Sequence, residues 1–484
     1  MRRRMIEEDD LEDKALCCRC VGDAYLSAEI RGQGRIRTCS YCGRSDRSYL
    51  IGALADRVET VFEEHYVRTL DQPNSWQQTL LSDRDSEYDW ERDGEPVVEA
   101  IRNSAEFPDD AAADIQSLLE DRHYDFDAAA MGEETEFSSD SHYEERSTDD
   151  GEWQAEWERF ERSLKIEARF FSRVALDHLT SVFENIGEFE TRDARPLILD
   201  AGPLTDLDTL YRARVFQSAG PLEEALCRPD LHLGAPPARL AAAGRMNARG
   251  ISVFYGATSA DVAVAEVRPP VGARVAVARF RIIRPIRLLD LTALPAVSSR
   301  GSVYDPTLGR RLARSMFLRS LGERMTRPIM PDDEAFDYLP TQAIADFLAT
   351  ESGDPLDGII FPSAQAADGS RNVVLFHKAA RTEAMAIANG TVIEAQSGRM
   401  YEEGWVVEYE VVEETPPAGA GQGGLAAVAW ARRHGAPADP DVRPATLRVV
   451  PDGVVVRHVQ TVQYATAEHE VRRRRRQRVE LDDL

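Results

Sequence analysis

The chain has 484 residues, a length that predicts about three domains, because a single hydrophobic core does not grow to that size. Its hydrophobic content of 43% and aromatic content of 8% are typical of a soluble globular protein. No run approaches the ~18 consecutive apolar residues of a membrane span. The net charge of −26 disfavours general nucleic-acid binding, since the chain offers no basic groove that would displace counterions.

The negative charge is concentrated in one stretch. Residues 83–158 contain 27 acidic and 5 basic side chains, so the rest of the chain is close to neutral. Near the C-terminus, residues 472–476 are five consecutive arginines, and Arg478 follows. This tail has two interpretations: a solvated segment that pairs with the acidic stretch of the same chain, or a segment that binds a polyanion or a partner.

Five of the six cysteines lie near the N-terminus. Cys17 and Cys20 form one Cys-x2-Cys pair, and Cys39 and Cys42 form a second pair after eighteen intervening residues. Four such thiolates can close tetrahedrally on one zinc ion, which predicts a structural zinc ribbon over residues 1–50; four unligated thiols are the alternative. Gly43 supplies the backbone freedom that the second turn requires. The chain begins with charged residues and no apolar stretch follows them, so we expect no signal peptide and a cytoplasmic protein.

A helical region follows over residues 51–195. Residues 51–70 carry Leu54, Val58, Val61 and Phe62 at helical spacing. Residues 128–152 are rich in Ser, Asp, Glu and Gly, which predicts an acidic linker or flexible loop. Residues 153–186 predict one long amphipathic helix with core-facing residues, namely Trp153, Trp157, Phe160, Leu164 and Phe171.

The remaining chain changes character after a connector at residues 196–208. β-like runs at 251–255, 274–283 and 373–376 alternate with helical pieces at 260–267 and 341–351, which predicts an α+β domain over residues 207–380. No Gly-x-Gly-x-x-Gly or Walker loop occurs in it. Further β-like runs at 405–412 and 446–456 predict a β-rich C-terminal extension with a basic tail over residues 381–484.

Two charged residues stand in apolar surroundings within residues 210–378. Glu266 lies inside Ala-Val-Ala-Glu-Val, where an unpaired carboxylate would be costly, and Arg212 follows Tyr211 at the start of a β-like run. A buried Arg212–Glu266 ion pair would explain both residues without any function.

The order of the motifs points to a function. Tyr211-Arg212, Gly244-Arg245-Met246-Asn247, Tyr255-Gly256-Ala257, Glu266 and Ser363 resemble the RES family, which is named for its Arg, Glu and Ser residues. Residues 338–342 and 372–376 resemble later segments of the family. The resemblance covers about 170 residues. The one departure is Met246, where Trp is common, and it concerns the packing of that loop.

The resemblance implies an ADP-ribosyltransferase-like mixed α/β fold and NAD as the substrate whose nicotinamide–ribose bond is broken. Arg212 would hold the diphosphate or ribose oxygens, and Arg245 would be a second phosphate anchor. Tyr255 would stack on the cationic nicotinamide, with Asn247 also on the cofactor-binding side. Glu266 would stabilise the oxocarbenium ion, and Ser363 would orient Glu266 or bind the ribose, unless it is only a turn residue.

The N-terminal half resembles the zinc-knuckle and helical HEPN-type domain that is often fused to RES modules. HEPN ribonucleases use an Arg-x4–6-His pair, and Arg173 and His178 have this spacing. On a continuous helix, however, positions five apart lie about 140° from each other and do not converge. A surface arginine and a half-buried histidine are therefore the simpler interpretation.

The sequence thus predicts a multidomain α+β protein: a zinc ribbon and an α-helical N-terminal half, then a RES domain with a β-rich extension. The leading hypothesis is an NAD-cleaving enzyme that acts by phosphorolysis, hydrolysis or ADP-ribosyl transfer, as a toxin or defence effector. An RNA-directed HEPN-type effector and a non-catalytic NAD-binding module are the alternatives. The expected partners are NAD, an antitoxin or regulatory protein, and a second copy in a homodimer; no membrane and no nucleic-acid partner are expected.

Overall fold

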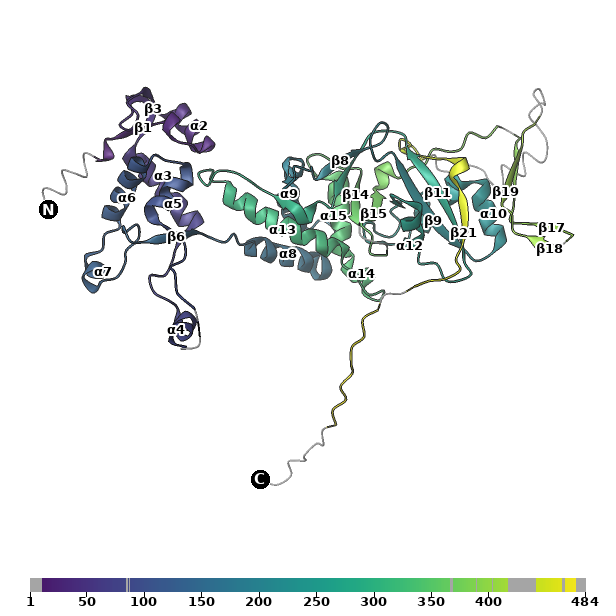
Figure 1. The fold of residues 1–484 in the computed structure, drawn as a ribbon. Coiled ribbons are helices and arrows are strands. Elements are labelled where there is room, and N and C mark those ends of the chain that lie inside the picture. The colour runs from purple at the N-terminus through teal and green to yellow at the C-terminus, as the bar shows by residue number, and fades with distance from the viewer. Residues whose placement is uncertain are drawn as a thin grey trace. The chain divides into compact units, whose positions relative to one another are not determined.

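The chain folds into two compact units (Figure 1). A computed structural model describes residues 11–83, 86, 88–365, 369–388, 390–402, 404–416, 441–463 and 466–475. The first unit comprises Met1–Ile198 and Asp290–Arg327, and the second comprises Leu199–Leu289 and Pro328–Leu484. None of the helices in the described ranges is long and apolar enough to cross a membrane.

The N-terminal part of the first unit combines small sheets with helices. Strand β3 pairs with β1 and β2, and β6 pairs with β4 and β5. The elements are β1 (Ala15–Cys17), a 3-10 turn (Cys18–Cys20), α2 (Ala24–Gln33), β2 (Arg35–Thr38), β3 (Ser45–Leu50), α3 (Ile51–His65), β4 (Tyr66–Arg68), α4 (Ser75–Ser82), β5 (Glu95–Pro96), α5 (Val97–Ala105), α6 (Asp109–Arg122), α7 (Phe126–Met131) and β6 (His142–Glu145). The helical spacing in α3 is confirmed, because Leu54, Val58, Val61 and Phe62 are all buried in this core.

The acidic stretch at 128–152 is more ordered than its composition predicted. Its strand β6 is the central strand of a three-stranded sheet, and Tyr143 on it is buried against Phe62 and Phe137. Aromatic burial at these positions supplies the contacts that the surrounding Ser, Asp and Glu residues lack. The linker interpretation is therefore wrong for the residues of β6.

The predicted long helix at 153–186 is interrupted. Helix α8 (Gly151–Arg162) continues as a π-helical turn (Ser163–Glu167), and α9 (Arg173–Phe183) begins anew after Ser172, whose Oγ accepts a hydrogen bond from the Ala175 N–H. Trp153, Trp157, Phe160 and Leu164 are buried as predicted. The expectation for Phe171 is wrong: it lies in the turn between the helices with φ +61° and is fully exposed.

A long helix from the segment Asp290–Arg327 completes the first unit. After a 3-10 turn (Ile186–Glu188), β7 (Glu190–Thr191) pairs with β13 (Val297–Ser298), which follows a 3-10 turn (Leu294–Ala296) and precedes α13 (Leu308–Thr326). Phe317 of α13 packs on Trp153 and Trp157. The buried Arg314 donates to the Val182 carbonyl at the C-terminus of α9, where a cation is favourable. Burial lowers the pKa of Arg314 to about 10.

Tyr304, in the loop before α13, is inserted into the core of the N-terminal part of this unit. Its side chain is almost fully buried, its hydroxyl lies 2.7 Å from Ser104 Oγ, and its ring meets Phe107 edge to face. The neighbouring Ser302 Oγ donates to Asp23, which also caps α2. This loop therefore connects the segment Asp290–Arg327 to the cysteine-bearing part of the first unit.

The second unit is built on a large sheet. Its strand order is β20-β11-β9-β10-β15-β14-β12-β8, and β21 also pairs with β11. The strands are β8 (Ile198–Ala201), β9 (Thr209–Phe216), β10 (Phe254–Ala257), β11 (Arg274–Ile282), β12 (Ile286–Asp290), β14 (Gly358–Pro362), β15 (Arg371–Leu375), β20 (Leu447–Val449) and β21 (Val455–His458). The helices and turns are α10 (Ala219–Cys227), α11 (Pro229–His232), α12 (Ala260–Glu266), α14 (Glu334–Asp337), α15 (Leu339–Thr350) and 3-10 turns at Ala238–Leu240, His377–Ala379 and Pro451–Gly453.

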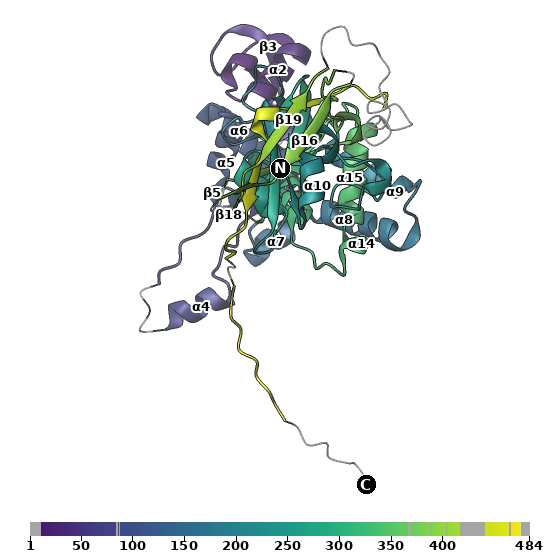
Figure 2. The ribbon, with the colours of Figure 1, turned by 90° about the vertical axis from the view of Figure 1, so that its right-hand side faces the viewer.

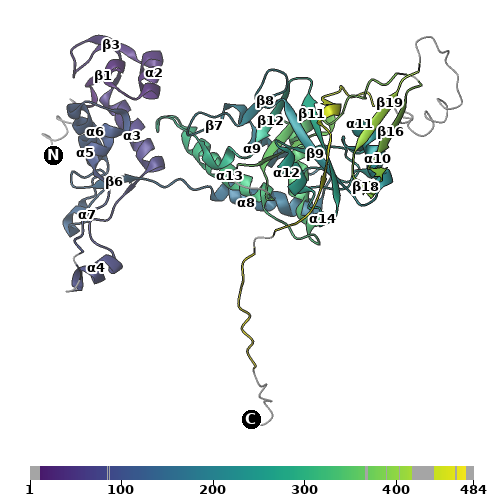
Figure 3. The ribbon, with the colours of Figure 1, turned by 45° about the vertical axis from the view of Figure 1, so that its right-hand side comes forward.

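Helices cover both faces of this sheet. Helix α12 packs on β9, β10 and β11 through Val262 and Ala263, with Ala213 and Ala257 beneath them. Helix α10 contributes Leu222 and Leu226 to a second core that contains Phe254 and Phe280 (Figure 3). Since alternate residues of a strand face opposite sides, β9, β10 and β11 contribute to both cores. The unit thus has a mixed α/β architecture with a layered core.

The C-terminal extension is only partly separate from the sheet. Strands β20 and β21 both pair with β11, so they form part of the main sheet. A two-stranded ribbon consists of β16 (Val392–Gln396) paired with β19 (Glu410–Glu414), and of β17 (Arg399–Tyr401) paired with β18 (Gly404–Val406). Strands β16 and β19 lie beside α10 (Figure 2).

Candidate functional site

The four cysteines with zinc-ribbon spacing come together. Cys17 lies at the end of β1, Cys20 ends the following 3-10 turn, and Cys39 and Cys42 lie between β2 and β3. Their sulfur atoms all lie within 4.8 Å of one another, with Cys17–Cys20 at 3.6 Å and Cys17–Cys42 at 3.7 Å. Sulfurs bound tetrahedrally to zinc at ~2.3 Å would be separated by about 3.8 Å, so the donor set fits this metal.

The neighbours of this cluster agree with the sequence interpretation. Gly43 has φ +73° and its N–H donates to the Cys39 carbonyl, which is the turn geometry that favours glycine. Cys18 is buried nearby but does not belong to the cluster, and Cys227 lies in the other unit. All four positions around a metal would be filled by thiolates, so the site is suited to a structural role.

A second cluster joins Glu266 to Ser363 and Asn372. Glu266 ends α12, Ser363 directly follows β14, and Asn372 lies on β15. Ser363 Oγ donates to Glu266 Oε1 at 2.6 Å, and Asn372 Nδ2 donates to the same oxygen at 2.8 Å. The carboxylate is thereby fixed through Oε1. Among the described residues, none forms a hydrogen bond or ion pair with Oε2.

Glu266 is exposed, contrary to the expectation from its apolar sequence neighbours. The helix buries Val262 and Ala263, whereas Glu266 lies in its last turn and is directed toward Ser363 and Asn372. The C-terminus of a helix is unfavourable for an anion, so these two donors stabilise a carboxylate that the helix does not. Asn372 itself is buried, and its Oδ1 has no hydrogen-bond partner.

The loop 244–247 is closed around Tyr255. The Tyr255 hydroxyl donates to Asn247 Oδ1 at 2.9 Å and accepts from the Met246 N–H at 3.0 Å. A Cβ on Gly244 would lie 2.7 Å from the Tyr255 hydroxyl, so only glycine fits there. Met246 is buried, which shows that this loop packs with Met in place of Trp. Burial raises the pKa of Tyr255 to about 12, so its hydroxyl remains protonated.

Asn247 supports the loop and has no donor left for a ligand. Its Nδ2 donates to the carbonyls of Ala242, Ala248 and Ile251 at 2.9–3.1 Å. Its Oδ1 is used by Tyr255. The geometry therefore gives Asn247 a positioning role.

Helix α15 holds the other side of this loop. Thr341 Oγ1 donates to the Arg245 carbonyl at 2.6 Å, and Gln342 Nε2 donates to the Gly244 carbonyl at 2.9 Å. The Arg245 guanidinium lies over the Tyr338 ring at 5.2 Å, an arrangement that stabilises a cation. Residues 338–342 thus fix both the backbone and the side-chain direction of Arg245.

Arg212 lies on the other face of the sheet from the Glu266 cluster. Tyr211 pairs with Ala257, which pairs with Asn372, so these three residues share the face under α12. Arg212 alternates with Tyr211, and its guanidinium lies over the Phe254 ring at 5.1 Å. Although the whole residue is half-buried, its Nη1 is shielded from solvent and lacks a hydrogen-bond partner. Burial lowers the pKa of Arg212 to about 10.

The buried Arg212–Glu266 ion pair is not formed. Glu266 is held by Ser363 and Asn372, and Arg212 has no carboxylate partner. The structure therefore brings Glu266 and Ser363 together, joins Tyr255, Asn247 and Arg245 in a second group, and leaves Arg212 apart. The sequence did not single out Asn372 and Tyr338, which belong to the segments 372–376 and 338–342. The available signal for Asn372 was that a polar residue opens the apolar run 373–376.

The Arg173–His178 pair does not converge. Both residues lie on one continuous helix, α9, where Arg173 is exposed and His178 is buried. His178 packs against Trp157, Phe160 and Phe317, and neither ring nitrogen has a hydrogen-bond partner. A cavity of about 450 Å³ beside it is lined by Arg159 and Arg162 but also by Glu156, Glu167 and Asp177.

The comparison with protein families gives a match over part of the chain. Residues 180–396 match the model of the RES domain, so the chain contains a RES domain. This match begins before and ends after the domain predicted at 207–380, and it includes the segment Asp290–Arg327 that packs in the first unit. Searches of the curated proteins and of the solved structures gave no match.

Proposed function

We propose that the chain cleaves NAD at the nicotinamide–ribose bond, with Glu266 as the catalytic carboxylate. The observation that carries this proposal is the fixed Glu266 side chain, whose Oε1 accepts hydrogen bonds from Ser363 and Asn372. Breaking the bond leaves positive charge on the ribose as nicotinamide departs. A preoriented carboxylate with a free oxygen stabilises that charge more in the transition state than in the ground state.

Three further residues have properties that suit parts of NAD. The half-buried ring of Tyr255 is held through its hydroxyl and would stack on the cationic nicotinamide. Arg245, directed by Tyr338, and Arg212 serve as phosphate anchors. Arg212 lies on the other face of the sheet from Glu266, so its assignment rests on the RES domain and on its unpaired Nη1.

Two orphaned buried atoms support a ligand of this chemistry. Asn372 Oδ1 is an acceptor without a donor, and a ribose hydroxyl would satisfy it. Arg212 Nη1 is a donor without an acceptor, and a phosphate oxygen would satisfy it. Leaving such groups unpaired costs free energy, which a bound ligand recovers.

The remaining functional assignments rest on the RES domain. An ADP-ribosyltransferase-like fold, a toxin or defence role, a cytoplasmic location and control by an antitoxin are part of the proposal on that ground. The acceptor is phosphate, water or a protein side chain, all of which would use the same carboxylate. The four-cysteine cluster is proposed to hold one structural zinc ion, which would tie β1 to the loop before β3.

The alternative functions have less support from the site. A ribonuclease centred on His178 would need a basic surface, whereas the cavity beside it carries three carboxylates for its two arginines. A non-catalytic NAD-binding module does not require Oε1 of Glu266 to be fixed by two donors.

Product analysis tests the proposal directly. Purified full-length protein is incubated with NAD, with and without inorganic phosphate, and the products are identified by mass spectrometry. Free nicotinamide is expected wherever the acceptor is present: together with ADP-ribose 1-phosphate if phosphate is the acceptor, and together with ADP-ribose even without phosphate if water is the acceptor. NAD that stays intact under both conditions and with added protein acceptors would contradict the proposal.

A further inference from the structure

The ribbon formed by β16–β19 is an acidic surface with exposed aromatic and aliphatic side chains. Residues 392–414 contain seven glutamates and one arginine. Met400, Tyr401, Trp405, Val406 and Val407 are each between 46% and 69% exposed. An isolated two-stranded ribbon is marginally stable in water, and clustered exposed apolar side chains usually mark a binding surface.

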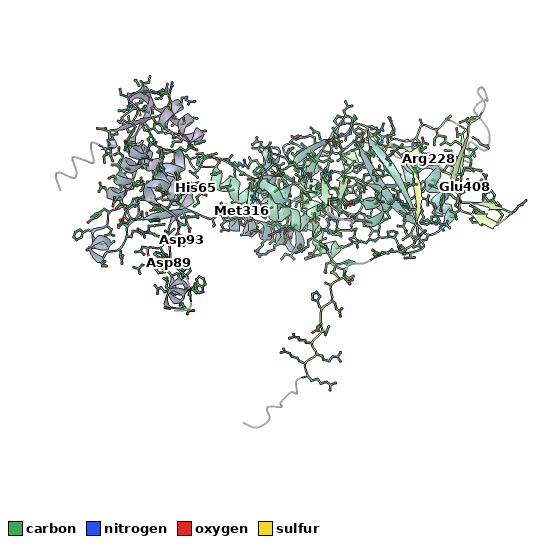
Figure 4. All side chains as sticks on the ribbon, in the orientation of Figure 1. His65, Asp89, Asp93, Arg228, Met316 and Glu408 are labelled. Atoms are coloured by element: carbon green, nitrogen blue, oxygen red, sulfur yellow. The ribbon has the colours of Figure 1, made fainter. Side chains whose placement is uncertain are left out.

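The base of the ribbon is anchored to the second unit. Ile393 and Ala395 of β16 lie toward α10, and the Tyr409 hydroxyl lies 2.7 Å from His458 Nε2 at the end of β21. Beyond this base the ribbon projects from the body of the unit, and Glu408 lies on it (Figure 4). The base of the ribbon therefore lies beside His458, at the end of β21, where the chain leaves the main sheet.

A cavity near the tip has the chemistry of a site for cationic side chains. It measures about 710 Å³ and is lined by Tyr401, Glu402, Val406, Val407 and Glu408. The Tyr401 hydroxyl donates to Glu408, which holds the ring in place. A guanidinium group beside an aromatic face and two carboxylates gains both cation–π and charge-assisted hydrogen bonding.

Most of the ribbon's carboxylates are not neutralised within the chain. Glu410 pairs with Arg399 at 2.9 Å. In the described part of the chain, Glu394, Glu402, Glu413 and Glu414 form no ion pair. On the ribbon's outer face Glu394 lies opposite Val412, so carboxylates and apolar side chains alternate there.

We propose that this ribbon binds the arginine run Arg472–Arg475 of the same chain. All four arginines are exposed, and none forms an ion pair with a described residue. The run follows β21, which ends at His458, the residue that contacts Tyr409 at the base of the ribbon. The ribbon thus belongs to the same compact unit as the tether, whereas the acidic stretch at 83–158 belongs to the other unit.

The tether is long enough for this contact. Thirteen residues separate His458 from Arg472, and they span up to about 45 Å when extended. From Tyr409 at its base to Glu402 near its tip, the ribbon extends over seven residues, or roughly 23 Å. A tether of this length gives effective concentrations on the order of millimolar, so weak charge pairing suffices.

Hydrogen exchange measured by mass spectrometry on the full chain tests this contact. Peptides from residues 392–414 should exchange about 10-fold more slowly in the wild type than in a variant with Arg472–Arg475 each replaced by Gln. Glu402→Gln with Glu408→Gln should have the same effect as the arginine variant, whereas the matched change Glu144→Gln with Glu145→Gln on β6 should leave the ribbon protected. In 1 M salt the difference should vanish.

Three results would overturn the proposal. Equal exchange of the ribbon in the wild type and the arginine variant would show that the run does not bind there. Protection that moves to peptides from residues 83–158 would assign the run to the other acidic segment. Ribbon protection that grows with protein concentration would assign the contact to a second copy of the chain. None of these measurements depends on NAD cleavage.

Discussion

Ser363 Oγ donates a hydrogen bond to Glu266 Oε1 at 2.6 Å, across 97 positions of sequence. Asn372 Nδ2 donates to the same oxygen at 2.8 Å. The second carboxylate oxygen remains available, so the two neutral residues would act as positioning residues for Glu266. The first prediction therefore concerns the loss of the Ser363 hydroxyl.

Ser363→Ala should lower kcat for NAD cleavage about 10-fold, because one charge-assisted hydrogen bond is worth about 1.5–3 kcal/mol. KM should change little, since the carboxylate acts on charge that develops only in the transition state. Ser363→Thr keeps the hydroxyl and should recover most of the rate. Ser352→Ala removes a hydroxyl that binds the Leu348 carbonyl in the same unit and should be neutral for turnover. A rise in KM with unchanged kcat would argue against the positioning role.

Zinc should be present at one ion per chain in freshly purified, reduced protein. Cys42→Ser opens the four-thiolate cluster and should abolish the zinc content and lower the melting temperature, because metal binding contributes folding free energy. Cys227→Ser, outside the cluster, should retain the metal. Elemental analysis of the three proteins is the measurement, and a wild type without zinc would refute the assignment.

Arg212→Met should weaken NAD binding roughly 10- to 100-fold, because it removes the charge-assisted hydrogen bonds that the guanidinium would form with the ligand. The melting temperature without NAD should not fall, because Nη1 has no partner to lose and the methionine still packs on Phe254. Arg214→Met, two residues along the same strand, is the matched control because Arg214 binds the His232 carbonyl and lies over the Phe216 ring. Calorimetric titration in a Glu266→Gln background avoids turnover. Identical dissociation constants for both variants would remove Arg212 from the site.

The first unit should lose stability as the pH falls below about 6.5, the ordinary pKa of histidine. Burial lowers the pKa of His178, and the nearby Glu156 opposes this shift only in part. The unfolded chain therefore binds a proton that the folded chain resists, so the unfolding free energy falls through this pH range. In the His178→Phe variant, the slope of the unfolding free energy against pH should decrease by the equivalent of up to one proton. Replacing the exposed His469 by Phe should leave this slope unchanged. Urea unfolding followed by the fluorescence of tryptophans such as Trp157 provides the measurement, and parallel pH profiles would contradict the prediction.

Local patterns predicted most of the helices and strands near the site. Short β-like runs predicted β11 and β15, and helical segments were predicted at α3, α12 and α15. The chain reversal between α8 and α9 was missed, because the π-helical turn continues the apolar spacing up to Leu164. Helix α13 was also missed: Phe317, Leu318, Leu321 and Met325 have helical spacing, but arginines interrupt it, and Arg314 is buried by tertiary contacts.

The sequence predicted the charged residues of the site but not the surroundings in which the fold places them. Glu266 and Ser363 were singled out in advance, whereas the exposure of Glu266 follows from the end of α12, which the sequence does not mark. The separation of Arg212 from Glu266 depends on strand register, since a shift of one residue reverses the face. Asn372 became recognisable only once β15 placed it opposite Ala257, under α12.

Glu266→Gln tests the central claim most directly. Both positioning hydrogen bonds go to Oε1, so a glutamine whose amide oxygen takes that place keeps them and loses only the charge. Turnover of NAD should fall about 10²- to 10³-fold, while the melting temperature and NAD affinity stay close to those of the wild type. Glu224→Gln, at an exposed position on α10, should be fully active. A folded Glu266→Gln protein that consumes NAD at the wild-type rate would contradict the account.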